Sequence, residues 1–195
     1  GEPTMYPKLP ELIKYLKSLE ATKSIFLVTN GQEPDMIQKL QDEDALPTQL
    51  YLSTNAADYE SFIKINKPKY DDSWERWNRT LDMLKDLDTR TVLRITLIRN
   101  YNDQKEMIPA FAEMFRKASP HFIEIKSYMH IGRSTNRLEH ENMLEMEEVK
   151  KFSEQIAKES KIFSIMDESL VSRISILQNN ERFIDRWIPT YANTN

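Results

Sequence analysis

The chain has 195 residues, of which 39% are hydrophobic and 30% are charged. That balance suits one large folded domain with a buried core and a charged surface. The formal net charge of −4 argues against broad, non-specific nucleic-acid binding but allows a local basic patch. The absence of cysteine excludes disulfides and thiolate-bound metals within these residues, and the three glycines form no phosphate-binding loop.

No targeting or membrane-spanning segment is indicated. No uncharged apolar run approaches the ~20 residues that a bilayer requires. The opening residues, GEPTMYPKLPELIKYL, lack the basic start and apolar middle of a signal peptide. We therefore expect a soluble, cytoplasmic protein without a membrane partner.

Helical and strand patterns alternate along the chain. In the first helix, leucine and isoleucine recur at three-and-four spacing after Pro7. Short apolar runs bounded by turn residues predict the strands. In chain order we expect a helix over 7–19, a strand over 24–28, a helix over 35–40, a strand over 48–53, helices over 58–65 and 74–87, a strand over 91–98, a helix over 103–117, a strand over 122–126, a long loop through Met143, a helix over 145–158, and two weaker strands near 162–165 and 172–177.

This order predicts an α/β fold with a parallel sheet and helices outside it. The strand interiors bear on the shape of that sheet. Arg94 and Thr96 alternate with aliphatic residues in one strand, and Glu124 and Lys126 do so in the next. Because an ordinary doubly wound sheet is apolar on both faces, a polar second face favours a barrel or half-barrel with a site near the carboxyl ends of its strands.

Six segments of the chain carry a family resemblance. They are GEPTMYP, FLVTNG, PTQLYLS, RITLIRNYND, FIEIKSYMHIGRSTNRLEHENM and ESLVSRISILQNNER, in that order. Together they resemble the wybutosine-synthesis radical SAM enzymes, the archaeal type more closely than the longer eukaryotic one. The series RxTLxRxYN and IEIKSYMHxGxSxxRL is far more specific than GEP alone. The resemblance implies a partial (β/α) radical-SAM-type half-barrel.

The two ends of the chain are interpreted from the same resemblance. GEPTMYP stands directly before a helix, without a strand leading into it. Residues 1–195 are therefore interpreted as the C-terminal part of a radical SAM domain that is truncated before Gly1. The similarity fades after about Arg182, so residues 183–195 are expected to form a loose tail.

The resemblance also implies a reaction. Members of the family condense N1-methylguanosine of phenylalanine tRNA with pyruvate to give 4-demethylwyosine. A [4Fe–4S] cluster on a CxxxCxxC motif reductively cleaves S-adenosylmethionine in this chemistry. The cluster cysteines and the lysine thought to hold pyruvate lie upstream of GEP in the family. The resemblance thus places no catalytic or metal-binding residue in this chain, and predicts that the chain is inactive alone. It implies tRNA, pyruvate and the missing N-terminal part as partners.

Candidate cofactor-binding residues follow from the matching motifs. Gly1, Glu2 and Pro3 match GEP, whose carbonyls and carboxylate receive the amino group of S-adenosylmethionine in the family. Alternatively, they are turn residues that lead into a helix. Thr29 and Asn30 end the next strand, where the family also contacts the cofactor.

Further cofactor contacts are implied on the next strand end and on a later loop. Ser53 ends its strand, and Asn55 stands where the family usually has aspartate, which is a stronger acceptor for a ribose than an amide is. Ile131 is a candidate for packing against adenine. The alternative is that Asn30 and Asn55 belong to simple turns and that Ile131 is a core residue.

Arg94 is a candidate site residue on physical grounds alone. It lies among apolar strand residues, where an arginine without an anion is costly. One partner is a carboxylate of the cofactor or substrate. The other is Glu124, which would form an internal ion pair with it, with Lys126 nearby. Both hold if the pair orients the arginine. We list Arg94 as a candidate cofactor contact, and Glu124 and Lys126 as candidate contacts to the substrate or tRNA.

The loop after the strand at 122–126 is the candidate RNA contact. It brings Tyr128, His130, Arg133 and Arg137 together, with Arg99 on the neighbouring strand end. Basic and aromatic side chains in one loop suit splayed bases and phosphates. The alternative is a basic loop that only solvates the surface.

Three functions remain to be separated. The first is a fragment of a tRNA-modifying radical SAM enzyme. The second is a cluster-less relative that binds nucleotide or RNA. The third, an ordinary (β/α) barrel aldolase or isomerase, is disfavoured by the order of the motifs. A CxxxCxxC motif encoded upstream of Gly1 would separate the first from the second.

Overall fold

The computed structural model describes residues 1–188. Its centre is a six-stranded sheet in the order β1-β2-β3-β4-β6-β5. The strands are β1 (Phe26–Thr29), β2 (Gln49–Ser53), β3 (Arg90–Leu97), β4 (Phe122–Ser127), β5 (Phe163–Ser169) and β6 (Ile174–Asn179). The first four pair in parallel, each with the next in the chain. The parallel arrangement expected for these four strands is confirmed.

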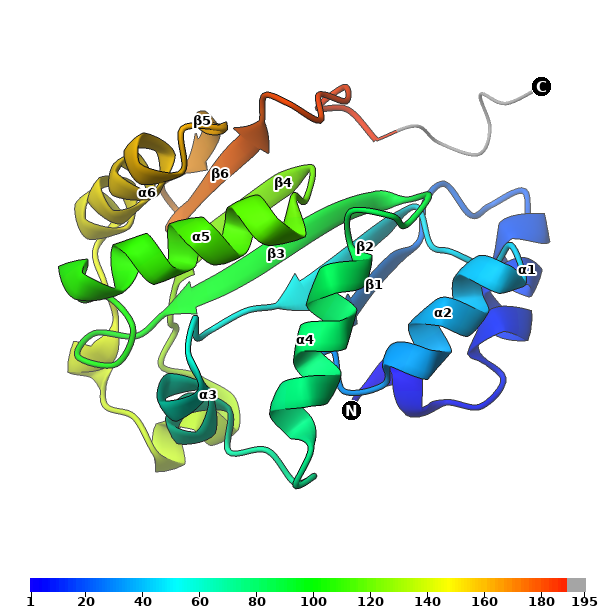
Figure 1. Cartoon of the computed structure of the whole chain (residues 1–195), viewed down its shortest axis with the longest axis horizontal. Helices are drawn as coiled ribbons and strands as arrows, with labels where there is room; N and C mark the ends of the chain where they lie inside the picture. The colour runs from blue at the N-terminus through cyan, green and yellow to red at the C-terminus, as the bar shows by residue number, and fades with distance from the viewer. Residues whose placement is uncertain (189–195) are drawn as a thin grey trace.

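Helices pack on one side of the sheet. Figure 1 shows α2, α4, α5 and α6 in front of the strands, and α3 at the carboxyl ends of β2 and β3. The helices are α1 (Leu9–Ser18), α2 (Pro34–Asp42), α3 (Tyr59–Asn66), α4 (Ser73–Met83), α5 (Ile108–Ala118) and α6 (Met146–Ser160). The expected α/β fold with helices outside is confirmed. Within residues 1–188, no helix has the length and apolar character to cross a membrane.

The last two strands form an antiparallel hairpin, which alternation alone does not predict. β6 pairs antiparallel with both β4 and β5. Only residues 170–173 link β5 to β6, whereas a parallel partner needs a crossover of a dozen residues or more. The short link therefore makes β6 run antiparallel to β5. The expected long loop after β4 contains two short 3-10 helices, η3 (Gly132–Asn136) and η4 (His140–Asn142).

The two faces of the sheet differ in chemistry. The face toward the helices is aliphatic, with Leu52, Leu93 and Ile123 fully buried. The opposite face, called the lumen face below, carries Arg94 and Glu124 beside a small apolar cluster of Tyr51, Val92 and Phe122 with Met166, Ile176 and Ile184. The polar second face expected from the alternation is confirmed.

Residues 183–188 lie against the lumen face near the amino ends of the strands. Gln178 donates to the carbonyl of Ile184 at 2.8 Å, and Arg90 donates to the carbonyls of Asp185 and Arg186 at 2.5 and 2.7 Å. The rest of the expected tail, residues 189–195, lies outside the described residues. At the other edge of the sheet, β1 leaves the side chains of Phe26 and Val28 exposed.

His121 makes the stability of the fold depend on pH. Its Nδ1 accepts the N–H of Thr91 at 3.1 Å, and burial, followed by the charges of Arg182 and Arg90, lowers its pKa from 6.5 to about 4. The unfolded chain therefore binds the proton more readily than the folded one between these values. We expect stability to be complete above pH 6.5 and to fall as the pH drops toward 4.

Urea unfolding between pH 7 and pH 4 measures this effect. His121→Asn is the control, because its amide oxygen can replace Nδ1 as an acceptor but does not titrate. A wild-type midpoint that falls no more than that of His121→Asn would contradict the prediction.

Candidate functional site

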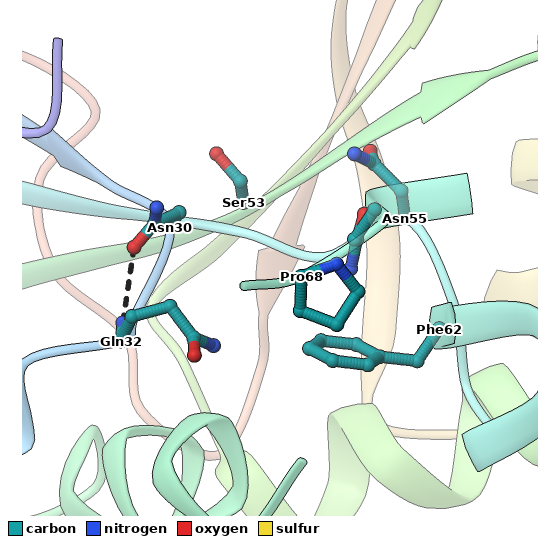
Figure 2. Close-up of a pocket in the computed structure, with 7 residues that line it drawn as sticks. Asn30, Gln32, Ser53, Asn55, Phe62 and Pro68 are labelled. Atoms are coloured by element: carbon teal, nitrogen blue, oxygen red, sulfur yellow. Dashed lines mark hydrogen bonds between the residues drawn. The ribbon is translucent and has the colours of Figure 1, made fainter. Parts of the chain in front are cut away.

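Two adjoining clefts open where β1 and β2 end. The first, of about 180 Å³, is lined by Asn30, Gln32, Ser53, Asn55, Phe62, Asn66 and Pro68 (Figure 2). The second, of about 310 Å³, shares Asn30, Gln32, Asn66 and Pro68 with the first and adds Glu2 and residues of the turn after α3. Of the expected cofactor residues, Glu2, Asn30, Ser53 and Asn55 are thus brought together. This edge is where parallel α/β sheets commonly bind ligands.

Glu2 holds the start of the chain on the end of β1. One carboxylate oxygen, Oε1, accepts the N–H and the hydroxyl of Thr4 and, at 2.7 Å, the hydroxyl of Thr29. The other, Oε2, accepts only the N–H of Asn30, at 2.8 Å. Glu2 thereby fixes Pro3, which begins the 3-10 helix η1 (Pro3–Met5), and leaves acceptor capacity on Oε2 at the cleft. Gly1 is exposed, with open space around its Cα.

The turn after β1 is shaped by Gly31. Its φ is +76°, and a Cβ there would lie 2.6 Å from Cδ1 of Leu52. The buried Thr29 hydroxyl accepts the N–H of Gly31, and Oδ1 of Asn30 accepts the N–H of Gln32 at 3.0 Å (Figure 2). Thr29 and the Asn30 oxygen are therefore occupied within the turn. The amide nitrogen of Asn30 remains as the donor that its side chain can offer to the cleft.

Gln32 is a cleft residue that the sequence reasoning missed. It is 8% exposed, and its Nε2 donates to the carbonyl of Ser73 at 3.1 Å. Its Oε1 is buried and has no hydrogen-bond partner in the protein. A buried acceptor without a partner costs free energy unless a ligand or water satisfies it. No sequence motif marks this residue, because its burial arises from α4 packing over the turn.

Ser53 and Asn55 lie on the other wall of the first cleft. The Ser53 carbonyl accepts the indole N–H of Trp77 at 3.2 Å, while its side chain lines the cleft. Oδ1 of Asn55 accepts the N–H of Thr96 at 3.0 Å, so it ties the loop after β2 to β3. Asn55 therefore has a structural contact between β2 and β3. Its amide can offer a ligand only the donor nitrogen.

Arg94 and Glu124 form an ion pair on the lumen face. They are direct neighbours on β3 and β4; the arginine Nε lies 2.7 Å from Oε1, and Nη2 donates to Oε2 at 3.3 Å. The guanidinium also lies 4.3 Å from the ring centroid of Tyr51. Burial, and then the Glu124 carboxylate, raise the pKa of Tyr51 above 10. Lys126 sits one alternation further along β4, at the same level as Thr96, without an ion pair among the described residues.

The loop from Tyr128 to Arg137 is built around a buried tyrosine. Tyr128 is 5% exposed, and its hydroxyl contacts Nδ1 of His130 at 3.2 Å and donates to Ser134 at 3.1 Å. Tyr128 therefore anchors the loop rather than presenting its ring. Ile131 is 65% exposed, so the alternative of a core isoleucine is wrong. Arg133 is exposed on η3.

The three arginines expected to contact RNA have different surroundings. The guanidinium of Arg99 is paired with Glu148 at the start of α6. Arg137 instead lines a small hollow together with Lys64 and Lys67 from the end of α3. The sequence reasoning missed these lysines, although KINKPK carries three of them within residues 64–69. Among residues 1–188, no group of three or more histidine or acidic side chains is arranged to hold a metal ion.

Two family models match the chain. The radical SAM superfamily model matches residues 1–112, and the model described as wyosine base formation matches residues 117–179. The first contains β1, β2 and β3 with both clefts, and the second contains β4, the loop after it and the β5–β6 hairpin. The boundary falls in α5, so one continuous sheet runs through both matches.

Curated relatives of the chain are synthases from archaea and eukaryotes. It is 43% identical over 187 residues to the S-adenosyl-L-methionine-dependent tRNA 4-demethylwyosine synthase of Methanocaldococcus jannaschii, and 37% identical over 181 residues to that of Pyrococcus abyssi. The alignments cover 95% and 93% of this chain but 55% and 52% of those relatives. The chain thus spans about half the length of the archaeal proteins that it matches.

Two solved structures are similar to this chain over most of its length. A structure of TYW1 with a lysine–pyruvate adduct bound superposes with a TM-score of 0.82 at 42% identity, covering 94% of this chain and 56% of that one. The crystal structure of an archaeal TYW1 gives a TM-score of 0.75 at 38% identity, with the same coverage. The expected half-barrel is therefore of the type that these proteins share.

Proposed function

Because the chain belongs to the radical SAM superfamily, we propose that it is the cofactor- and substrate-facing half of a tRNA 4-demethylwyosine synthase. The reaction would be the condensation of N1-methylguanosine in phenylalanine tRNA with pyruvate, in the cytoplasm. The observation that carries the proposal is the match of the wyosine base formation model on the same sheet as the superfamily match. The names of the similar synthases support the same substrate class.

The two clefts fit S-adenosylmethionine chemically. Superfamily membership implies this cofactor, which supplies the radical chemistry when bound. Oε2 of Glu2 and the orphaned Oε1 of Gln32 offer acceptors for an ammonium or a ribose hydroxyl. The Ser53 hydroxyl and the amide nitrogen of Asn55 line the adjoining wall. We assign these residues, with Gly1, Pro3, Thr29 and Asn30 as the supporting backbone, to cofactor binding, and Ile131 to packing against its adenine.

A [4Fe–4S] cluster does not fit the residues present. The superfamily implies such a cluster in the complete enzyme, but the 195 residues contain no cysteine to bind it. We propose that the cluster ligands, and the group that holds pyruvate, come from the half of the relatives that this chain does not match. The residues here would then bind and orient the cofactor and the base.

Substrate contacts are proposed on the lumen face and the loop after β4. Arg94 is fixed by Glu124 and keeps 28% of its side chain exposed, so one side remains open to a carboxylate. Lys126 adds an unpaired cation on the same face. Tyr128 and His130 contact each other and so anchor the loop that carries Arg133 and Arg137 toward the RNA. We assign Arg99, which is paired with Glu148, to the same RNA contact.

The test compares the complete protein containing these residues with the 195-residue chain alone. After anaerobic reconstitution, the complete protein should convert N1-methylguanosine in tRNA to 4-demethylwyosine, detected by mass spectrometry of the nucleosides. The isolated chain should bind no stoichiometric iron and sulfide and form no product, since it has no thiolate ligands. Gln32→Leu in the complete protein should raise the dissociation constant for S-adenosylmethionine, because it removes the free acceptor.

Different failures have different meanings. A complete protein that binds tRNA but neither assembles a cluster nor makes product would support the cluster-less binding relative instead. A cubane charge-transfer band that persists on the desalted 195-residue chain would contradict the assignment of the cluster to other residues.

A further inference from the structure

A basic hollow lies beside the second cleft, at the same end of the sheet. Lys64, Lys67 and Arg137 line it, and its remaining wall consists of Ile65, Ile98, Tyr101 and Leu138. No carboxylate lines it. The three cations come from two segments about 70 residues apart in sequence, α3 with its C-cap and the end of the η3 loop, so the fold assembles them.

The three cations around the hollow have no carboxylate partner. Most arginines of the described chain, such as Arg76, Arg94 and Arg99, are paired with carboxylates. Within residues 1–188, Lys64, Lys67 and Arg137 form no ion pair, and all three are exposed. On a chain with a net charge of −4, three unpaired cations gathered around one hollow create a local positive field.

The backbone that carries the three cations is ordered, and one of their side chains is oriented by a ring contact. The ammonium of Lys64 lies 5.2 Å from the ring centroid of Tyr101, a cation–π contact that orients it. Lys67 caps α3 in the left-handed conformation, with φ +46°, and its N–H donates to Ile63 at 3.2 Å. Arg137 follows η3, and its N–H donates to Ser134 at 2.9 Å. Ordered backbone beneath each cation reduces the entropy lost when an anion binds.

The size and position of the hollow limit the ligand. Its volume of about 70 Å³ is room for about five water molecules, which suits one tetrahedral anion rather than a nucleoside. Lys67 also lines the second cleft, so an anion in the hollow would lie next to the proposed cofactor site.

We propose that Lys64, Lys67 and Arg137 bind one backbone phosphate of the substrate RNA and so set the register in which the reacting base approaches the cofactor clefts. This inference rests on the proposed function for the identity of the RNA. Binding of the phosphate by three cations would supply affinity without reading sequence, and contacts to the base itself would then supply the choice of base.

The test uses the complete protein that contains these residues. Fluorescence anisotropy at several salt concentrations measures its binding to tRNA that has been transcribed in vitro. Lys64→Ala/Lys67→Ala/Arg137→Ala should weaken binding on the order of tenfold or more and lower the salt slope by about one, because one phosphate is no longer neutralised. The control variant, Lys85→Ala/Lys151→Ala/Lys158→Ala, removes the same charge from exposed, unpaired lysines on the helix side and should stay within about twofold of wild type.

Equal losses in both triple variants, or no loss in the first, would overturn the inference. So would a complete protein that does not bind tRNA. None of these results depends on product formation. The proposed function can therefore survive the loss of this subsite, and the subsite can survive a complete protein that makes no 4-demethylwyosine.

Discussion

Arg94→Ala is expected to destabilise the folded chain by about 3 kcal/mol, because it leaves the buried Glu124 carboxylate without its cation. The value lies at the lower end for a broken buried pair, since Arg94 keeps 28% of its side chain exposed. Loss of the guanidinium over Tyr51 adds a packing defect. Urea unfolding at pH 7 measures the change.

A double variant separates the structural role of the pair from a role toward the substrate. Arg94→Met/Glu124→Leu removes both charges and should recover most of the lost stability. If Arg94 also meets a carboxylate of the substrate, the complete protein with this double variant should fold, assemble its cluster and still fail to make product. Normal product formation by the double variant would confine Arg94 to a structural role.

Gly31→Ala should have an effect of similar size, about 2–5 kcal/mol. The left-handed φ of +76° costs an alanine roughly 1–2 kcal/mol, and forcing its Cβ against Leu52 and Trp77 costs about 1–3 kcal/mol more. Leu52 is fully buried and cannot move aside freely. The turn that presents Asn30 and Gln32 to both clefts would shift, so cofactor affinity should fall together with stability.

Gly132→Ala is the matched control. Gly132 has a similar φ of +62°, but a Cβ there meets nothing within 4 Å. Thermal unfolding of the two variants therefore separates backbone strain from the clash. Equal destabilisation by Gly31→Ala and Gly132→Ala would mean that the close approach to Leu52 has no energetic consequence.

The sequence predicts the strands and their faces well, because alternation is a local property. Arg94 and Glu124 stand out in two apolar strands, and the structure places them side by side. The direction of β6 is not local in this sense. It depends on how short the link from β5 is, and a rule of alternating elements ignores link length.

The candidate site is harder to predict from the sequence than the sheet is, because its chemistry depends on which hydrogen-bond donors and acceptors already have partners in the protein. The carboxylate of Glu2 and the amide of Asn55 suggest ligand binding in sequence, yet most of their acceptor capacity goes to neighbouring strands. The free acceptor is on Gln32, which no motif marks. A binding role for Lys64 and Lys67 can be recognised only in the fold, which brings Arg137 to the same hollow.

Strand β1 leaves one edge of the described sheet open. Within residues 1–188 it pairs on one side only, with β2, and its four residues contain neither a charge nor a proline. Phe26 and Val28 are 49% and 39% exposed beside that open edge. An uncovered, apolar strand edge is a template for pairing with a second chain. Four residues at the margin of the sheet therefore present an edge at which a further strand can pair.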